Sequence, residues 1–248
     1  MNPKTARKRL DLLLVERGLA ETRQKAQAMI LAGEVSVDGA RIQKAGAATS
    51  TLARIEVASR LQKFVGRGGF KLEGALEDFS IDVAGCVCVD VGSSTGGFTD
   101  CLLQNGAARV YAVDVNVRQL AWKLQQDPRV ISIECNARQL LPSGVPESAD
   151  LVVIDVSFIS VTKVLAPAMA LAKPGGELLV LVKPQFELER RDVGPGGIVK
   201  DEALHNKAIG SVVSVACALH LQIFGVKPSR LPGAEGNQEY FLHARKNG

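Results

Sequence analysis

The chain is poor in the residues that build disulfide frameworks and metal sites. Its 248 residues include five cysteines and three histidines. No two cysteines stand in a CxxC pair, and an odd number without paired spacing favours reduced, buried thiols over disulfide bonds. The histidines lie apart from one another and from the cysteines, so the sequence predicts no metal site.

Long apolar runs and a secretion signal are also missing. No apolar run reaches the roughly 18 residues that a membrane helix needs. The most apolar region, residues 151–172, contains Asp155 and Lys163, and charges are penalised at the centre of a bilayer. The basic N-terminus precedes an apolar run that carries Asp11 and Glu16 and has no small-residue cleavage site. We therefore expect a cytoplasmic protein without stable membrane association.

Positive charge is concentrated in the first quarter of the chain. Residues 1–63 hold twelve Lys or Arg and six Asp or Glu, a net charge of +6, whereas the whole chain carries +4. Such a cluster is typical of a nucleic-acid-binding module, although an ordinary solvated face is the alternative. The candidate phosphate contacts, with Arg67 added from the following segment, are Lys4, Arg7, Lys8, Arg9, Arg23, Lys25, Arg41 and Lys44.

The same region has the pattern of a small α+β domain. Leucines at helical spacing predict a first helix that Gly18 ends, and Thr22 can cap a second helix that Gly33 ends. Residues 35–43 alternate apolar and polar around an Asp-Gly pair, which predicts a hairpin. We place this domain at residues 1–60 and a glycine-rich, basic linker at residues 61–71.

From residue 86 onward, apolar runs alternate with helical stretches. The predicted strands are Cys86–Val91, Arg109–Val115, Val130–Ile133, Leu151–Asp155 and Glu177–Val182. Nearly continuous apolar strands separated by helices are typical of a parallel sheet that is covered on both faces. The fold class is therefore α/β, a doubly wound, Rossmann-like domain over residues 72–248.

The turn after the first of these strands, residues 90–98, is expected to bind a nucleotide-like cofactor. Ser94 replaces the second glycine of the dinucleotide fingerprint, and no P-loop lysine follows. Asp90 would repel phosphate and attract a cation such as the amino group of S-adenosylmethionine. Asp114 could accept ribose hydroxyls, and Asn136 could read adenine or only cap its loop. The predicted contacts to S-adenosylmethionine are Asp90, Gly92, Ser94, Gly96, Gly97, Phe98, Asp114, Asn136 and Asp155.

Four ionisable residues stand at element ends of this domain: Lys71, Asp155, Lys183 and Glu239. Lys183 is the most informative, because a lysine directly after a buried strand costs desolvation unless it has a role. Attack by a ribose hydroxyl on a methyl donor needs positioning and removal of a proton. Our hypothesis is that Lys183 accepts the proton and that Lys71 favours its neutral amine and steers the hydroxyl. Asp155 and Glu239 would orient the two lysines.

Residues 7–55 resemble the RNA-binding domain named after small-subunit ribosomal protein four, through Arg9-Leu10-Asp11 and residues 32–39. The whole chain resembles the TlyA family, which joins that domain to an FtsJ-like ribose methyltransferase. The matching segments are residues 67–72, 94–99, 155–160, 182–187, 194–197 and 236–241. The resemblance implies a catalytic tetrad at Lys71, Asp155, Lys183 and Glu239. It also implies a cytidine ribose of ribosomal RNA as the target and a seven-stranded sheet with an antiparallel last strand.

The chain departs from the family pattern at three places. Gly66 stands where serine is expected and Arg118 where glycine is expected, so the contacts of those two loops stay open. The chain stops at Gly248 without the C-terminal helix of longer members, and the short form is expected to act on the large ribosomal subunit. A membrane-active, haemolysin-like protein and a small-molecule methyltransferase are the alternatives. The oligomeric state is not predicted.

Overall fold

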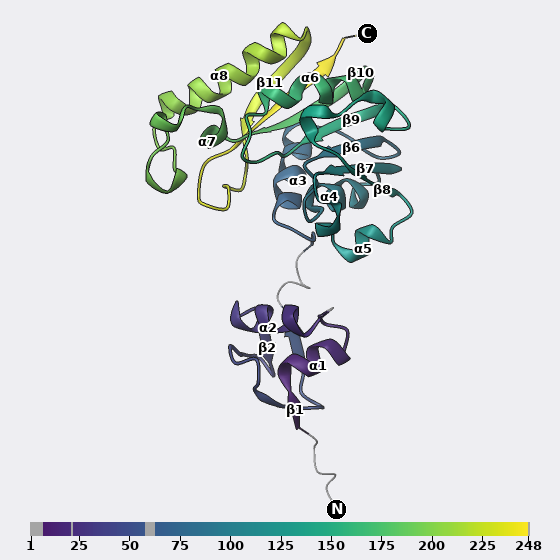
Figure 1. Cartoon of the computed structure of the whole chain (residues 1–248), viewed down its shortest axis with the longest axis vertical. Helices are drawn as coiled ribbons and strands as arrows, with labels where there is room; N and C mark the ends of the chain where they lie inside the picture. Colours follow the sequence, from purple (N-terminus) through teal and green to yellow (C-terminus); the bar gives the residue numbers. More distant parts are fainter. Residues whose placement is uncertain (1–6, 21, 58–62, 248) are drawn as a thin grey trace, which may run out of the picture. The chain divides into compact units, whose positions relative to one another are not determined.

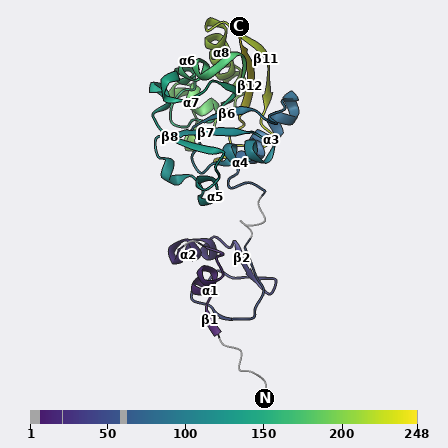
Figure 2. The same ribbon diagram turned by 90° about the vertical axis from the view of Figure 1, so that its right-hand side faces the viewer.

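The computed structural model describes residues 7–20, 22–57 and 63–247. These residues form two compact units, Met1–Lys63 and Phe64–Gly248, each with its own hydrophobic core (Figures 1 and 2).

The described residues of the first unit form two helices and five short strands. They are β1 (Arg7–Arg9), α1 (Leu10–Glu16), α2 (Arg23–Leu31), β2 (Val35–Val37), β3 (Ala40–Arg41), β4 (Ala48–Ser50) and β5 (Ile55–Val57). Strand β1 pairs with β4, and β2 pairs with β3 and β5, all antiparallel. Leu10, Leu14 and Ile30 from the helices pack on Val35 and Val57 from the strands.

The two helices and the β2–β3 hairpin were predicted from the sequence. The Thr22 hydroxyl accepts a hydrogen bond from the Lys25 backbone N–H at 3.2 Å and caps α2. Gly18 and Gly33 have φ values of +59° and +72°, the left-handed conformation that commonly ends helices. Strands β1, β4 and β5 were not predicted, because each is three residues long and, unlike β2 and β3, none adjoins an Asp-Gly turn.

The second unit is built on one seven-stranded sheet. Its strands are β6 (Val87–Val91), β7 (Arg109–Asp114), β8 (Val130–Glu134), β9 (Ala149–Ile154), β10 (Ala172–Val182), β11 (Leu221–Pro228) and β12 (Tyr240–Lys246). They lie in the order β11-β12-β10-β9-β6-β7-β8. Strands β6 to β10 are mutually parallel, and β12 is antiparallel to both neighbours. The α/β class and the antiparallel last strand are confirmed.

Alternate side chains of the strands pack into two separate core clusters, one on each face of the sheet. Cys88 faces α3 (Gly68–Phe79) and α4 (Gly97–Gln104), whereas its neighbour Val89 faces α6 (Thr162–Leu171) and α8 (Glu202–Ala218). The short helices α5 (Trp122–Gln125) and α7 (Pro184–Glu187) follow β7 and β10. Since β6 connects to β7 on one side and pairs with β9 on the other, the order of strands reverses between β6 and β9. Ligands of such sheets bind at this point, beyond the carboxyl ends of the strands.

The predicted linker over residues 61–71 is wrong in its second half. Phe64 is 1% exposed and belongs to the core beneath α3, and α3 begins at Gly68. A Cβ on Gly69 would lie 2.4 Å from the Phe64 ring. These glycines therefore serve close packing rather than chain flexibility, which the sequence pattern does not distinguish.

All five cysteines are free thiols. The prediction that all five are core residues is wrong. Cys88 and Cys101 are buried, whereas Cys217 on α8 is exposed. Among the described residues, no helix combines the length and the apolar character that a membrane crossing requires. The same residues contain no group of three His, Cys, Asp or Glu side chains that could hold a metal ion.

Candidate active site

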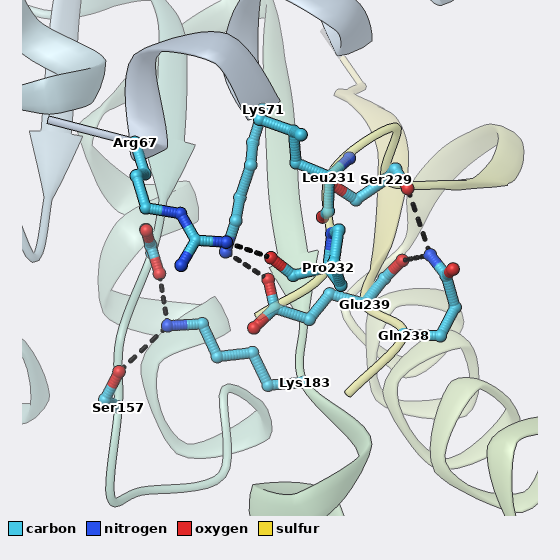
Figure 3. A network of polar contacts seen from close by, with 10 residues as sticks. Arg67, Lys71, Ser157, Lys183, Ser229, Leu231, Pro232, Gln238 and Glu239 are labelled. Carbon is cyan, nitrogen blue, oxygen red and sulfur yellow. Dashed lines mark hydrogen bonds and ion pairs between the residues drawn. The ribbon is translucent and has the colours of Figure 1, made fainter. Parts of the chain in front are cut away.

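Two lysine–carboxylate pairs lie at the carboxyl ends of the central strands (Figure 3). Lys183, which follows β10, has its Nζ 2.5 Å from Asp155 Oδ1, and Asp155 follows β9. Lys71 on α3 donates to Glu239 Oε2 at 2.6 Å, and Glu239 precedes β12. Both lysines are 8% exposed, so neither is an ordinary surface cation.

Lys183 has a second partner that the sequence hypothesis did not include. Its Nζ donates to the Ser157 hydroxyl at 2.8 Å, as Figure 3 shows. Asp155 Oδ1, by contrast, lies within ion-pair distance but receives no well-directed hydrogen bond. Ser157 lies in the family-like segment 155–160, but its polar type is common in loops and alone gives no signal. Together, Asp155 and Ser157 fix the position of the Lys183 ammonium group.

Hydrogen bonds of Asn237 and Gln238 hold the loop that carries Glu239. The Gln238 side-chain amide donates to the Ser229 and Glu239 carbonyls at 3.0 Å and 2.7 Å. The Asn237 amide, 1% exposed, accepts from Val199 N–H and donates to the Gly197 carbonyl, both at 2.8 Å. Glu239 is therefore held in place although no regular element contains it.

Arg67 is the one predicted RNA contact in the second unit. Its side chain is directed into the region between Lys71 and Lys183 and donates to the Pro232 carbonyl at 3.3 Å (Figure 3). Arg67 is otherwise exposed. It places an additional cation at the edge of the site.

Asp90, at the end of β6, is completely buried. Its Oδ2 accepts from the Thr99 hydroxyl at 2.6 Å, while Oδ1 has no hydrogen-bond partner among the described residues. Burial raises the pKa of this carboxyl group to about 7, against the opposing hydrogen bond from Thr99. A buried carboxylate oxygen without a hydrogen-bond donor is stabilised by a nearby positive charge. Asp90 is therefore suited to interact with a cationic ligand.

The next strand supplies a second carboxylate, Asp114. Asp114 Oδ2 accepts from Ser94 N–H at 2.9 Å, and Oδ1 accepts from Asn116 N–H at 3.0 Å. It therefore links the turn after β6 to the loop after β7. Asn136 accepts from Arg138 N–H at 3.0 Å, which is the loop-capping role considered from the sequence. The adenine contact of Asn136 stays a prediction.

The structure gives its own reason for the glycines of the turn. A Cβ on Gly92 would lie 2.3 Å from the Asp155 carbonyl oxygen, and one on Gly96 would lie 2.3 Å from a Leu124 methyl group. Gly97 approaches the backbone of Gly69 at the start of α3. The sequence interpretation, that these glycines leave room for a ligand, is therefore not needed to explain them. Packing inside the protein already requires them.

In the first unit, one buried carboxylate organises several of the predicted RNA contacts. Asp11, 0% exposed, receives hydrogen bonds from Arg9 at 2.8 Å, Arg23 at 3.0 Å and Gln27 at 2.9 Å. The Arg9 guanidinium holds the pKa of Asp11 well below its usual range. Both arginine side chains remain about half exposed, so their guanidinium groups are fixed at the surface.

Other predicted RNA contacts differ in their surroundings. Lys8 pairs with Glu16 at 2.9 Å, and Lys4 lies outside the described residues. The remaining four are exposed: Arg7, Lys25, Arg41 and Lys44.

Comparison with known proteins places these sites in a family. A family model described as FtsJ-like methyltransferase matches residues 64–246, and one described as S4 domain matches residues 8–47. The 16S/23S rRNA (cytidine-2′-O)-methyltransferase TlyA of Mycobacterium tuberculosis is 47% identical over 241 residues. The match covers 96% of this chain and 90% of that protein. The chain belongs to the TlyA family.

One further relative named TlyA and one solved structure agree with this assignment. The 23S rRNA (cytidine-2′-O)-methyltransferase TlyA of Campylobacter jejuni is 35% identical over 187 residues, 74% of this chain and 72% of that protein. A solved structure described as a hemolysin from Streptococcus thermophilus superposes with a TM-score of 0.75 at 38% identity, covering 98% of this chain and 90% of that one. The second unit is thus a methyltransferase domain, and the first is an S4 domain.

Proposed function

We propose that this TlyA-family enzyme transfers a methyl group from S-adenosylmethionine to the 2′-hydroxyl of a cytidine ribose in ribosomal RNA. The observation that carries the proposal is the buried Lys183, held by Asp155 and Ser157 beside the Lys71–Glu239 pair. The S4 domain and the rRNA methyltransferase relative support an RNA substrate. Ribosomal RNA or a ribosomal subunit is then the partner.

The residues after β6 and β7 fit the cofactor. S-adenosylmethionine supplies an electrophilic methyl group next to a cationic sulfur when it is bound. Asp90, with an unpartnered buried oxygen, offers the negative charge for a cationic ligand, and Asp114 offers acceptors for ribose hydroxyls. The rest of the predicted contact set is spread over four places: Gly92, Ser94 and Gly96 lie in the same turn, Gly97 and Phe98 begin α4, Asn136 lies in the loop after β8, and Asp155 follows β9.

The four tetrad residues divide the work between proton transfer and orientation. Lys183 accepts the proton of the ribose hydroxyl, with Asp155 and Ser157 fixing its Nζ. Lys71, oriented by Glu239, steers the hydroxyl and adds positive charge near Lys183. Holding the acceptor in line with the methyl group contributes the remaining acceleration.

The large ribosomal subunit is the proposed target. The M. tuberculosis and C. jejuni relatives are named for 16S/23S and for 23S ribosomal RNA, so 23S RNA is common to both names. The decisive experiment offers labelled methyl donor and separated subunits from cells that lack this gene, followed by mapping of the modified nucleotide. Label on one 2′-oxygen of large-subunit RNA is expected. Label on neither subunit, with cofactor binding intact, would contradict the proposal.

Replacing Lys183 tests the proposed base. Lys183→Arg keeps the positive charge but cannot readily give up its proton, so methyl transfer should fall by about 10² to 10⁴ while cofactor affinity stays. Single-turnover transfer to large-subunit RNA measures the rate, and calorimetry measures the affinity. A variant that keeps most of its activity would remove Lys183 as the base.

The hemolysin description of the S. thermophilus structure defines a second activity to test. Purified protein is incubated with erythrocytes beside its Lys183→Arg variant. We expect neither to lyse the cells. Lysis that does not depend on Lys183 would favour a membrane activity separate from methyl transfer.

A further inference from the structure

Tyr240 lies next to both lysine–carboxylate pairs along the backbone. It directly follows Glu239 and begins β12, and its cross-strand partner is Val182, the residue before Lys183. The pair Val182–Tyr240 is the last in the ladder between β10 and β12. Lys183 and Glu239 therefore leave two adjacent strands at the same level, and a shift of Tyr240 would move Glu239 relative to Lys183.

His205 on α8 holds the Tyr240 side chain. Its Nδ1 lies 2.9 Å from the Tyr240 hydroxyl oxygen, and its Nε2 lies 2.9 Å from the Val199 carbonyl oxygen. Because a carbonyl oxygen only accepts, Nε2 carries the hydrogen of the neutral ring and Nδ1 accepts from the hydroxyl. Burial raises the pKa of Tyr240, which keeps its hydroxyl protonated and able to donate. The two rings also meet edge to face, with 5.7 Å between their centroids.

Val199 closes a circuit of hydrogen bonds around Glu239. Its carbonyl accepts from His205, and its N–H donates to Asn237 Oδ1 at 2.8 Å. Asn237 stands two residues before Glu239, and Tyr240 stands one residue after it. The chain on both sides of Glu239 is therefore bound to the backbone of one residue. We call Tyr240, His205, Val199 and Asn237 the Val199 circuit.

Helix α8 gives this circuit a fixed support. His205 lies in the first turn of the helix, which Asp201 caps by accepting from Ala203 N–H at 2.8 Å. Val212 of the same helix is buried in the core against the sheet. The backbone of His205 is thus held by a regular element, and its side chain can fix loops that have no regular structure of their own.

The position of the Glu239 carboxylate depends on that of its loop. Oε2 accepts from Lys71 at 2.6 Å, and a Cβ on Gly233 would lie 2.6 Å from Oε1. The carboxylate therefore lies between Lys71 on α3 and the backbone of the loop. A misplacement of about 1 Å in a catalytic site can cost about 10²-fold in rate. Loosening of the Val199 circuit would therefore affect methyl transfer as well as stability.

We propose that His205 is a positioning residue of the methyltransferase, which holds Glu239, and with it Lys71, in the geometry for methyl transfer. The inference rests on the proposed function. In this assignment His205 touches neither the substrate nor the cofactor and acts only through Glu239. Loss of its hydrogen bonds should slow the transfer step without weakening the binding of RNA or S-adenosylmethionine.

Tyr240→Phe tests the circuit by removing only the hydroxyl that joins Tyr240 to His205. The single-turnover rate at saturating large-subunit RNA should fall about two- to tenfold, the equivalent of one hydrogen bond, with both affinities unchanged. His205→Phe keeps a ring at this place and should slow transfer at least as much. Adding Tyr240→Phe to His205→Phe should change little further, because the same bond is already lost.

Tyr111, the other tyrosine of the chain, provides the matched control. Its hydroxyl donates to Glu147 at 2.8 Å, and Glu147 precedes β9, at the end of the sheet opposite to Lys183. Tyr111→Phe should lower the melting temperature about as much as Tyr240→Phe but keep the wild-type rate. If Tyr240→Phe also keeps the wild-type rate, the positioning role is overturned.

A double-mutant cycle tests whether the effect passes through Glu239. In the Glu239→Ala background, Tyr240→Phe should change the remaining rate by less than about twofold, because the group that the circuit positions is absent. The same loss in this background as in the wild type would overturn the assignment of Glu239 as the residue through which His205 acts.

Hydrogen exchange of residues 194–200 and 229–241 is measured in parallel, since it does not depend on the RNA acceptor. His205→Phe should speed exchange at Val199 N–H and at Ser229 N–H, which donates to the Glu239 carbonyl. Faster exchange together with no methylation of ribosomal RNA by the wild type would support the positioning and contradict the proposed acceptor. Methylation by the wild type and unchanged rates in the variants would leave the proposed function standing and overturn the positioning.

Discussion

At the scale of single residues, Asp90 carries the largest electrostatic cost in the proposed cofactor site. Its folded-state pKa of about 7 lies above the ordinary value of 3.8, because burial opposes the charged form. The unfolded chain therefore loses this proton first as pH rises. The resulting cost in folding free energy develops between about pH 4 and pH 7, reaches up to about 4 kcal/mol and stays above that range.

Asp90→Asn should remove this cost while keeping the acceptor for Thr99. In the absence of cofactor, the melting temperature of the variant relative to that of the wild type should rise from pH 5 to pH 8, because most of the cost develops between these values. Calorimetric melting at both values measures the difference. Exposed Asp82 caps its loop through Ala84 N–H, and Asp82→Asn should shift melting equally at both values. Parallel pH profiles for Asp90→Asn and the wild type would show that the pKa of Asp90 is not raised in the folded protein.

Single residues could be predicted from the sequence where an ionisable side chain stands near the end of a predicted strand or helix. Lys71, Asp155, Lys183 and Glu239 could be named together in advance because each matches a family segment, but which carboxylate pairs with which lysine could not be predicted, and their catalytic roles stay predictions. The structure adds Ser157, whose hydroxyl contacts Lys183. It could not be singled out because a loop serine has many ordinary roles and its partner lies 26 positions away in sequence.

At the scale of elements, the turn after β6 is fixed by contact with the loop after β9. Gly92 has φ of +89°, and its missing Cβ would lie 2.3 Å from the Asp155 carbonyl oxygen. That contact sets the distance between the turn after β6 and Asp155, whose carboxylate pairs with Lys183. A side chain here would therefore disturb both the fold and the tetrad.

Gly92→Ala should destabilise the protein by about 2–4 kcal/mol, combining backbone strain with displacement of the Asp155 loop. Gly85 provides the matched control, because its φ is +73° but nothing lies within 4 Å of its missing Cβ. Gly85→Ala should cost only about 1 kcal/mol, the backbone part alone. Urea denaturation measures the free energy of unfolding of both variants. Equal decreases in the two variants would mean that the Asp155 loop moves away from the new Cβ at no cost in free energy.

Strands with a long apolar run could be predicted from the sequence with nearly correct ends. The predicted strands 86–91 and 130–133 correspond to β6 and β8 with ends shifted by one residue. The segment 61–71 was misjudged because glycines that permit close packing look the same in sequence as glycines of a linker. Only the position of Phe64 beneath Gly69 distinguishes the two.

At the scale of the whole molecule, the basic S4 domain and the nearly neutral methyltransferase domain have different tasks. The +6 charge of residues 1–63 predicts an RNA affinity that depends steeply on salt. A methyltransferase for small molecules has no use for that charge. Replacing surface cations of the S4 domain therefore distinguishes an RNA substrate, whose binding should weaken, from a small-molecule substrate, whose binding should not change.

Arg41→Gln/Lys44→Gln changes two exposed residues of the S4 domain in the full chain. The salt slope for binding large-subunit RNA should fall by roughly 1.5, with cofactor affinity unchanged, because each phosphate contact releases close to one counterion. Filter binding over a salt series gives the slope, and calorimetry gives the cofactor affinity. Since the two substitutions lie far in sequence from the tetrad, transfer at saturating RNA should match the wild type while transfer at limiting RNA declines. Unchanged transfer at limiting RNA would instead mean that the S4 cations do not deliver the substrate, and the case for a small-molecule acceptor would strengthen.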